Sequence, residues 1–219
     1  MSRRRTYEGE GIEVSYDASR CIHAAECANG LPSVFDPDRR PWVDPNGASA
    51  DEVAAVIHRC PTGALAYRRL DGGAEEGAPS AASVRVVDDG PLYCTGMLRV
   101  QVVGQDEPLD ETRVALCRCG RSSHKPFCDN AHADAGFAAS GPLGTTSRAP
   151  SAESAVGPVL ISPRANGPLV FDGDVEVSRP GESERLPLSR PAFCRCGHSS
   201  NKPFCDGTHR SAGFTAEGF

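Results

Sequence analysis

The stretch CRCGHSSNKPFCDGTH occupies residues 194–209, and the closely similar stretch CRCGRSSHKPFCDNAH occupies residues 117–132. The same offset of 77 residues aligns Gly90-Pro91-Leu92 with Gly167-Pro168-Leu169, without a gap. The second part of the chain is therefore a tandem repeat. A side chain whose chemistry is essential to the repeated unit should occur in both copies, which separates candidate ligands from incidental residues.

Four residues in each copy pass this test and form the pattern C-x-C-x8-C-x3-H. They are Cys117, Cys119, Cys128 and His132 in the first copy, and Cys194, Cys196, Cys205 and His209 in the second. Three thiolates and one imidazole suit either a structural zinc ion or an iron–sulfur centre. Zinc sites commonly use C-x2-C pairs around one ion, whereas two separate ligand pairs can each hold one iron of a [2Fe–2S] cluster. The spacing favours two [2Fe–2S] clusters, with zinc as the alternative.

Cysteines and histidines without a counterpart are not expected to be ligands in the repeat. His124 aligns with Asn201, and Cys94 aligns with Phe171. We expect Cys94 to be a free thiol in a strand, with a role at the first cluster as the alternative.

Ten cysteines imply metal binding only if the chain is kept in a reducing compartment. The stretch from Met1 to Val14 contains no apolar run typical of a signal peptide. No stretch approaches the ~20 apolar residues of a membrane span. We therefore expect a cytoplasmic protein that is not embedded in a membrane. Its net charge of −6 argues against a general nucleic-acid binder and suits docking on a basic redox partner.

Two stretches rich in small residues, 71–83 and 141–157, are expected to be linkers. They divide the chain into units at residues 1–70, 84–140 and 158–219. Four short segments with strand-like composition are expected in the repeats, at residues 83–87, 98–103, 159–162 and 175–178. We predict an α+β protein whose two repeated units are rich in β-strands and carry their cysteines at one end.

The N-terminal unit has three cysteines, Cys21, Cys27 and Cys60. A cysteine followed by proline, as at Cys60, is the usual closing ligand of a bacterial ferredoxin site. Cys21 and Cys27 match the outer pair of C-x2-C-x2-C, in which Ala24 replaces the middle cysteine. Three thiolates make a [3Fe–4S] cluster the simplest fit. A [4Fe–4S] cluster would need a fourth ligand that is not cysteine, and His23 is the best-placed candidate.

Three local patterns suggest how this unit folds. Residues 11–16 alternate as a strand, and residues 41–43 are expected to form another. Ser49 and Glu52 form a capping box that opens a helix through about Arg59, which delivers Cys60 at its end. This arrangement predicts a small ferredoxin-like domain.

The repeated stretches resemble the CDGSH iron–sulfur family, to which mitoNEET-type proteins belong. The resemblance is carried by CRC at 194–196 and KPFCDGTH at 202–209, and it is slightly looser in the first copy. It implies [2Fe–2S] clusters held by three cysteines and one histidine, and two units packed around a pseudo-twofold axis. Because both units lie on one chain, we expect an intramolecular pseudodimer and a monomeric protein.

Residues 7–70 are similar to the divergent [4Fe–4S] mono-cluster domain family. The similarity is carried by C-x-H-x3-C at 21–27, Pro41-Trp42, and CPTGAL at 60–65. Such domains also occur joined to CDGSH units, so the two resemblances support each other.

The two repeats differ beside their second ligand pair. Asn130 and Ala131 stand where the second copy has Gly207 and Thr208. Asparagine tolerates the left-handed backbone that glycine adopts, whereas alanine removes a hydroxyl near the cluster. We therefore expect the two clusters to differ in reduction potential. Lys125 is expected either to stabilise cluster charge or to be solvated, as is Lys202.

Three clusters without a recognisable site for a substrate predict an electron-transfer protein. No P-loop, G-x-S-x-G or H-E-x-x-H pattern is present, so we do not expect an enzyme. The expected partners are a reductase or an acceptor protein. The alternative is a protein that donates or loses its histidine-ligated clusters in response to redox state or pH.

Overall fold

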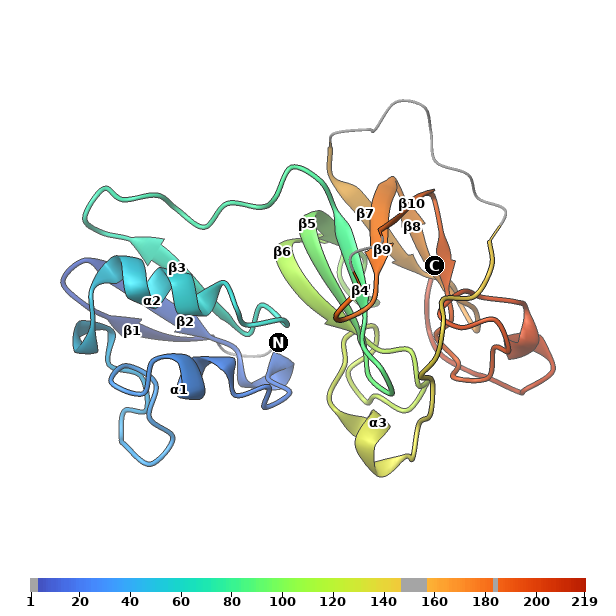
Figure 1. Cartoon of the computed structure of the whole chain (residues 1–219), viewed down its shortest axis with the longest axis horizontal. Coiled ribbons are helices and arrows are strands. Elements are labelled where there is room, and N and C mark those ends of the chain that lie inside the picture. Colours follow the sequence, from blue (N-terminus) through green and yellow to red (C-terminus); the bar gives the residue numbers. More distant parts are fainter. Residues whose placement is uncertain (1–3, 147–156, 183–184) are drawn as a thin grey trace. The chain divides into compact units, whose positions relative to one another are not determined.

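The computed structural model describes residues 4–146, 157–182 and 185–219 (Figure 1). The chain divides into two compact units, Met1–Gly77 and Ala78–Phe219. Helices and strands are both present, as the α+β prediction requires. No helix among these residues is long and apolar enough to cross a membrane.

The N-terminal unit is built on a three-stranded antiparallel sheet in the order β1-β2-β3. Its strands and helices are β1 (Arg5–Glu8), β2 (Ile12–Tyr16), α1 (Glu26–Gly30), α2 (Ala50–Ile57) and β3 (Leu65–Arg69), with short 3-10 turns at Ala18–Arg20 and Pro45–Gly47. Helix α2 begins at the predicted capping box, in which Ser49 and Glu52 exchange hydrogen bonds. Its buried face packs against the sheet in a core that includes Ile12, Val14, Val53, Ile57 and Leu65.

The predicted strand at residues 11–16 is confirmed as β2, whereas the predicted strand at 41–43 is wrong. Val43 forms only an isolated bridge with Phe35. The apolar character of this segment serves packing instead, because the Trp42 ring lies edge-on against Tyr16 with centroids 4.8 Å apart. Strands β1 and β3 escaped prediction because charged residues interrupt their apolar pattern.

The C-terminal unit contains both repeats in one eight-stranded sheet. The first repeat supplies β4 (Ser83–Val86), β5 (Leu92–Val100), β6 (Leu109–Leu116) and helix α3 (Ala131–Asp134). The second supplies β7 (Val159–Pro163), β8 (Leu169–Asp172), β9 (Asp174–Ser178), β10 (Leu186–Ser189), β11 (Ala192–Phe193) and a 3-10 turn at Thr208–Arg210. The order is β10-β9-β4-β5-β7-β8-β11, and β6 pairs with β5.

The four predicted strand segments lie in β4, β5, β7 and β9, but β5 begins earlier and ends earlier than predicted. The other four strands were not predicted. The predicted linker at 141–157 is described only in part. Its residues 141–146 carry no regular structure, but Gly144 donates to the Lys202 carbonyl at 2.9 Å. Residues 147–156 lie outside the described residues.

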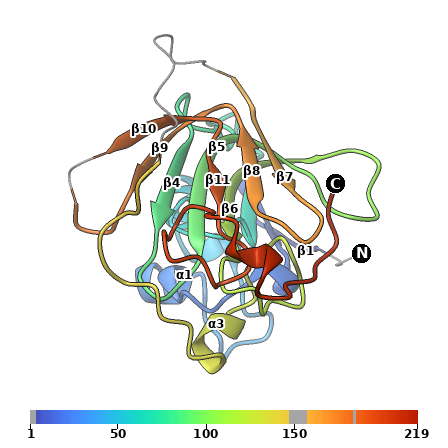
Figure 2. The same cartoon turned by 90° about the vertical axis from the view of Figure 1, so that its right-hand side faces the viewer.

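Strands of the two repeats are interleaved in the sheet, as Figure 2 shows. β4 of the first repeat pairs in parallel with β9 of the second, with Val84 opposite Val177. β7 of the second repeat pairs in parallel with β5 of the first, with Ile161 opposite Val100. The repeat offset converts one residue pair into the other, so the same contact is made twice with the roles exchanged.

A single hydrophobic core lies on this sheet and draws on both repeats. Val84, Leu92 and Val100 come from the first repeat, and Ile161 and Phe171 from the second. Each of these side chains is essentially inaccessible to solvent. Neither repeat therefore completes its apolar core with its own residues alone.

Candidate metal centres

The first ligand pair of each repeat directly follows a strand of the shared sheet. Cys117 comes after β6 and Cys194 after β11. The Sγ atoms of Cys117 and Cys119 lie 3.6 Å apart, and those of Cys194 and Cys196 lie 3.7 Å apart. All four cysteines are buried, so the sheet fixes where each pair of sulfurs sits.

The second ligand pair of each repeat spans a tight turn. In the first repeat Asn130 has φ 72°, and in the second Gly207 has φ 89°. The expectation that Asn130 takes the left-handed backbone is confirmed. The turn brings Cys128 Sγ within 3.4 Å of His132 Nδ1, and the same distance separates Cys205 from His209.

These distances match two donors on one tetrahedral metal ion. Bonds of about 2.3 Å to sulfur and 2.0–2.1 Å to nitrogen place two sulfurs ~3.8 Å apart and a sulfur and nitrogen ~3.5 Å apart. Over the described ranges, no group of three or more Cys, His, Asp or Glu side chains is placed to hold one metal ion. The donor distances join a Cys–Cys pair and a Cys–His pair in each repeat.

Backbone amides point at the ligand sulfurs in both loops. The N–H of Arg121 donates to Cys119 Sγ at 3.4 Å, and the N–H of His198 donates to Cys196 Sγ at the same distance. Asn130 N donates to Cys128 Sγ, also at 3.4 Å. Such bonds stabilise thiolates and their metal complexes, and they tune the reduction potential of an iron–sulfur centre.

In the first loop, the pKa values of the Cys117 and Cys119 thiols shift in opposite directions. A hydrogen bond from Cys119 lowers the pKa of Cys117 to about 6, and the same bond raises the pKa of Cys119. Burial raises the pKa of Cys128 to about 11 and lowers the pKa of His132. Metal binding to this loop must therefore release protons from buried thiols.

A carboxylate braces the turn of each second pair. Asp206 accepts from Ser200 N at 2.8 Å, Ser200 Oγ at 2.9 Å and Thr208 N at 3.0 Å, and the Thr208 amide makes the largest contribution to lowering its pKa. The Thr208 hydroxyl adds to that effect. Asp129 accepts the corresponding backbone bonds, but Ala131 has no hydroxyl to add. The two sites therefore differ in the hydrogen bonding next to a ligand.

Both lysines near the sites donate to their own loops. Lys125 Nζ donates to the Ser122 carbonyl, and Lys202 Nζ donates to the Ser199 carbonyl at 2.6 Å. These bonds hold each ammonium group inside the cluster-binding loop rather than in open solvent.

In the N-terminal unit the three cysteines line one open cavity. Ala24 lines it as well, in the place of a fourth cysteine, whereas His23 is exposed and is not among the lining residues. Burial is the main cause that raises the pKa of Cys27. The structure therefore brings the three predicted cysteine ligands to one cavity. Ala24 lines the same cavity but has no ligand atom.

Three other polar residues of this cavity were not found from the sequence. Thr62 Oγ1 lies 3.5 Å from Cys60 Sγ and also accepts from Ala64 N. Burial raises the pKa of Tyr16, and a hydrogen bond with Cys21 adds to the shift. Glu26, which precedes Cys27 in the chain, is the third of these lining residues. The only sequence signal for Thr62 is its place two residues after Cys60.

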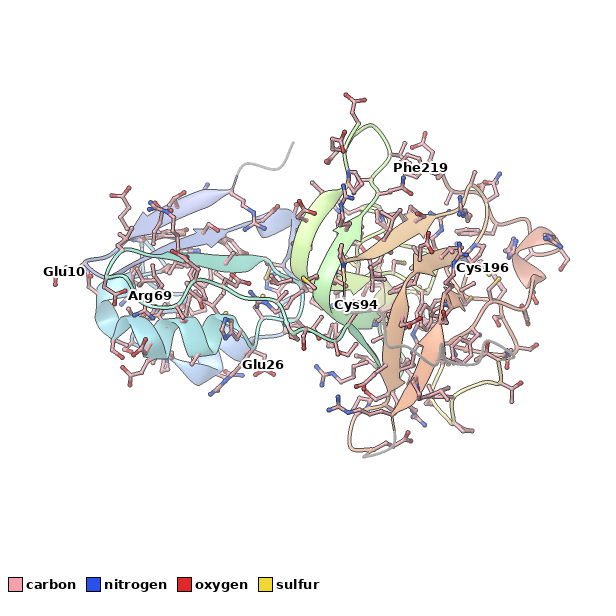
Figure 3. All side chains as sticks on the ribbon, turned by 90° about the horizontal axis from the view of Figure 1, so that it is seen from above. Glu10, Glu26, Arg69, Cys94, Cys196 and Phe219 are labelled. Carbon is pink, nitrogen blue, oxygen red and sulfur yellow. The ribbon has the colours of Figure 1, made fainter. Side chains whose placement is uncertain are left out.

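Cys94 is buried in β5, as expected, where it pairs with Val84 and Val114. Figure 3 shows it within the sheet, apart from the loop that carries Cys196. Burial raises its pKa, so it remains a neutral thiol of the core.

Comparison with known proteins supports both parts of this picture. The family model described as "Iron-binding zinc finger CDGSH type" matches residues 89–133 and 166–210, and the model described as "Divergent 4Fe-4S mono-cluster" matches residues 7–70. The protein named "Uncharacterized protein YjdI" is 39% identical over 64 residues in Escherichia coli K12 and in Escherichia coli O157:H7. That alignment covers 29% of this chain and 84% of each relative. No solved structure matches the chain.

The descriptions of both families name iron, and the paired donors and the three gathered cysteines fit iron–sulfur cofactors. The four-iron description of the first family does not support the three-iron cluster expected for the N-terminal unit. The chain belongs to the divergent 4Fe-4S mono-cluster family through its N-terminal unit and to the CDGSH iron-binding family through the two repeats that follow.

Proposed function

We propose that this protein is an electron carrier with one ferredoxin-type cluster and two [2Fe–2S] clusters, each held by three cysteines and one histidine. The observation that carries the proposal is the donor geometry of the repeats. Both copies present a Cys–Cys pair and a Cys–His pair, and each pair has the spacing for one iron. When bound, such clusters supply one-electron redox chemistry, and the chain's own residues set their potential and exposure.

The cysteine and histidine ligands of each repeat differ in their exposure to solvent. Cys117 and Cys194 are 1% exposed, whereas His132 and His209 are half-buried at the outer edge of their loops. An electron would therefore enter or leave each repeat at the histidine edge, and the sheet would shield the cysteine edge from water. We assign the chain a role as carrier rather than enzyme, in a reducing cytosol, with a reductase or an acceptor protein as its partner.

We further infer that the two repeats form an intramolecular pseudodimer and that the protein is a monomer. The exchanged pairings of β4 with β9 and β7 with β5 support this, because each repeat receives from the other what a second subunit would supply. A stable dimer in light scattering would contradict the inference.

For the N-terminal unit we propose a ferredoxin-like domain with a [4Fe–4S] cluster held by Cys21, Cys27 and Cys60. The fourth iron then has no cysteine. Of the side chains with oxygen or nitrogen donors that line the cavity, Glu26 has no hydrogen bond or ion pair within the described residues. His23, which the sequence suggested as the fourth ligand, would have to turn toward the cavity to bind the fourth iron.

Anaerobically purified protein tests the function through its optical spectrum and a reductive titration followed by EPR. We expect a coloured sample with visible absorption, and reduction of all three clusters by a ferredoxin reductase. The two [2Fe–2S] centres should have different midpoint potentials, because only the second has the Thr208 hydroxyl beside its Asp206 brace. A colourless zinc protein would defeat the proposal, and indistinguishable midpoints would defeat the inequality.

The Ala24→Cys variant is expected to complete a four-cysteine site in the N-terminal unit. Residue 24 already lines the cavity between Cys21 and Cys27, so a thiolate there restores the C-x2-C-x2-C pattern. We expect a cluster that resists loss of one iron on ferricyanide oxidation, whereas the wild type should convert to a three-iron EPR signal. The matched control is Ala28→Cys, one residue beyond Cys27 and outside the cavity lining. Equal conversion in wild type and Ala24→Cys would contradict the assignment.

A second candidate function is cluster donation, favoured by the half-buried histidine of each repeat, which is more exposed than Cys117 and Cys194. A protonated imidazole is a poor ligand, so acid would release the cluster at this ligand. Transfer to an apo-ferredoxin that is fast in the wild type and abolished in a His132→Cys/His209→Cys double variant would favour donation over pure electron transfer.

A further inference from the structure

The segment that follows the first repeat is bound to the ligand loop of the second repeat, residues 194–209. Gly144 N donates to the Lys202 carbonyl at 2.9 Å. The Asn201 side chain makes two further bonds to a single residue, because its Oδ1 accepts from Thr145 N at 2.8 Å and its Nδ2 donates to the Thr145 carbonyl at 2.7 Å. The chain therefore holds its own second loop through three hydrogen bonds to backbone groups.

We call residues 143–145 the clasp. A Cβ on Gly144 would lie 2.3 Å from the Asn201 carbonyl oxygen, so the second loop accepts only glycine at this position of the clasp. Leu143, just before it, packs against the hydrophobic core. The side-chain amide of asparagine carries both a donor and an acceptor, which suits it to pair with the N–H and C=O of one residue. The second loop thus recognises an apolar residue followed by glycine, mainly through the backbone.

The ligand loop of the first repeat, residues 117–132, has the corresponding backbone groups but binds no such segment. His124 and Lys125 stand at the positions of Asn201 and Lys202. Both lysine side chains donate to their own loops in the same way. The Lys125 carbonyl, which corresponds to the acceptor used by the clasp, accepts no hydrogen bond within the described residues. The first loop therefore presents an unused backbone acceptor.

A pocket opens at this part of the first loop. Lys125 and Pro126, which flank the unused carbonyl, both line it. Residues 215–217 line it as well, and the repeat offset aligns them with residues 138–140, which lead directly into the clasp. The pocket on the first loop therefore corresponds to the place where the clasp reaches the second loop.

The pocket combines this polar acceptor with an apolar contact. Val103 is one of its lining residues and is 42% exposed. Beyond Glu217 the described chain bonds to another element, because Phe219 N donates to the Pro163 carbonyl at 2.9 Å. An exposed apolar side chain and an unused carbonyl in one pocket are what an apolar residue followed by glycine would contact.

We propose that the first ligand loop is a docking site for a short, glycine-containing segment of a redox partner protein, which binds there as the clasp binds the second loop. This inference rests on the proposed function and assigns the partner to one loop. The glycine N–H of the partner would donate to the Lys125 carbonyl, and the apolar residue before it would contact Val103. The first cluster would then exchange electrons with the partner, while the clasp covers the loop of the second.

The exchange of Asn201 for His124 sets the strength of this docking. A histidine ring has its donor and its acceptor on separate nitrogens and cannot pair with both backbone groups of one residue as an amide does. The first loop therefore binds a segment of this kind more weakly than the second loop binds the clasp. Weak, reversible docking is typical of complexes between electron carriers.

The test is photo-crosslinking of a synthetic peptide to the full chain loaded with its clusters. The peptide has the sequence of residues 139–146, with a photoreactive analogue in place of its leucine. We expect crosslinks to the pocket around Lys125 and Val103, located by mass spectrometry, and less labelling of the second loop, which already holds the clasp. The His124→Asn variant should bind a fluorescent form of the peptide roughly tenfold more tightly, because it adds the donor and acceptor that Asn201 uses.

Two matched controls accompany this test. The same peptide with Gly144→Ala should fail to bind, because its added Cβ would meet the loop backbone. The Arg121→Gln variant removes an exposed arginine of the same loop that does not line the pocket, and it should bind the peptide as the wild type does. Equal binding of the glycine and alanine peptides, crosslinks confined to sites outside the pocket, or binding seen only in His124→Asn would each overturn the inference.

A kinetic measurement connects the pocket to electron transfer. The glycine peptide should slow reduction of the [2Fe–2S] clusters by a ferredoxin reductase, whereas the alanine peptide should not. Equal rates would overturn docking of a redox partner at this loop. A wild-type chain without two [2Fe–2S] clusters would contradict the proposed function itself, whereas a chain with both clusters and no specific peptide site would contradict only the docking.

Discussion

The Gly197→Ala variant is expected to lose both [2Fe–2S] clusters and to unfold more easily. Its new Cβ would lie 2.6 Å from the Cys119 carbonyl oxygen, closer than such atoms approach in proteins, and the obstacle is backbone that cannot rotate away. Gly197 also has φ +83°, where a Cβ is disfavoured. The two effects together should lower the free energy of unfolding of the C-terminal unit by about 2–5 kcal/mol. Iron content, visible absorption and denaturant unfolding measure the outcome.

A control for this variant exists in the same unit. Gly104 has the same φ of +83°, and a Cβ there would have no neighbour within 4 Å. Gly104→Ala should therefore cost only the backbone term of about 1–2 kcal/mol and keep both clusters. If the two variants behave alike, the loop contact contributes nothing and only backbone strain is measured.

Replacing a ligand histidine with cysteine is expected to give the largest redox effect. In His132→Cys the added thiolate makes the cluster more negative, so its midpoint potential should fall by roughly 100–300 mV. The potential of the wild-type centre should rise as the pH falls, because a proton taken up at the imidazole stabilises the reduced form. That pH dependence should disappear in the variant. A redox titration at several pH values tests both points.

The control for the histidine variant is His124→Asn, which gives the first loop the residue that the second loop has at the aligned position 201. His124 is exposed and lies 3.6 Å from Asp129, outside the ligand pairs. Its replacement should leave both the potential and its pH dependence as in the wild type. Unchanged potentials in His132→Cys would show that this histidine is not a ligand.

The sequence by itself determined the local parts of the metal sites. The spacings C-x-C and C-x3-H are short enough that chain geometry brings each pair together, and the distances of 3.4–3.7 Å within the pairs agree with that interpretation. The left-handed turn at Asn130 and the capping box at Ser49 were predictable for the same reason. Each depends on residues within one turn of one another.

Only the tertiary structure decided how distant segments meet. The pairing of Val84 with Val177 joins residues far apart in the chain, and strand propensity does not specify a partner strand. The failed strand at residues 41–43 has the same origin, because Trp42 is apolar for packing against Tyr16 rather than for pairing. The burial of Arg118 was equally invisible in the sequence, since arginine is ordinarily exposed. Its guanidinium group donates to the carbonyls of Val87, Gly90 and Ala139, which are distant in the chain and meet it only in the folded unit.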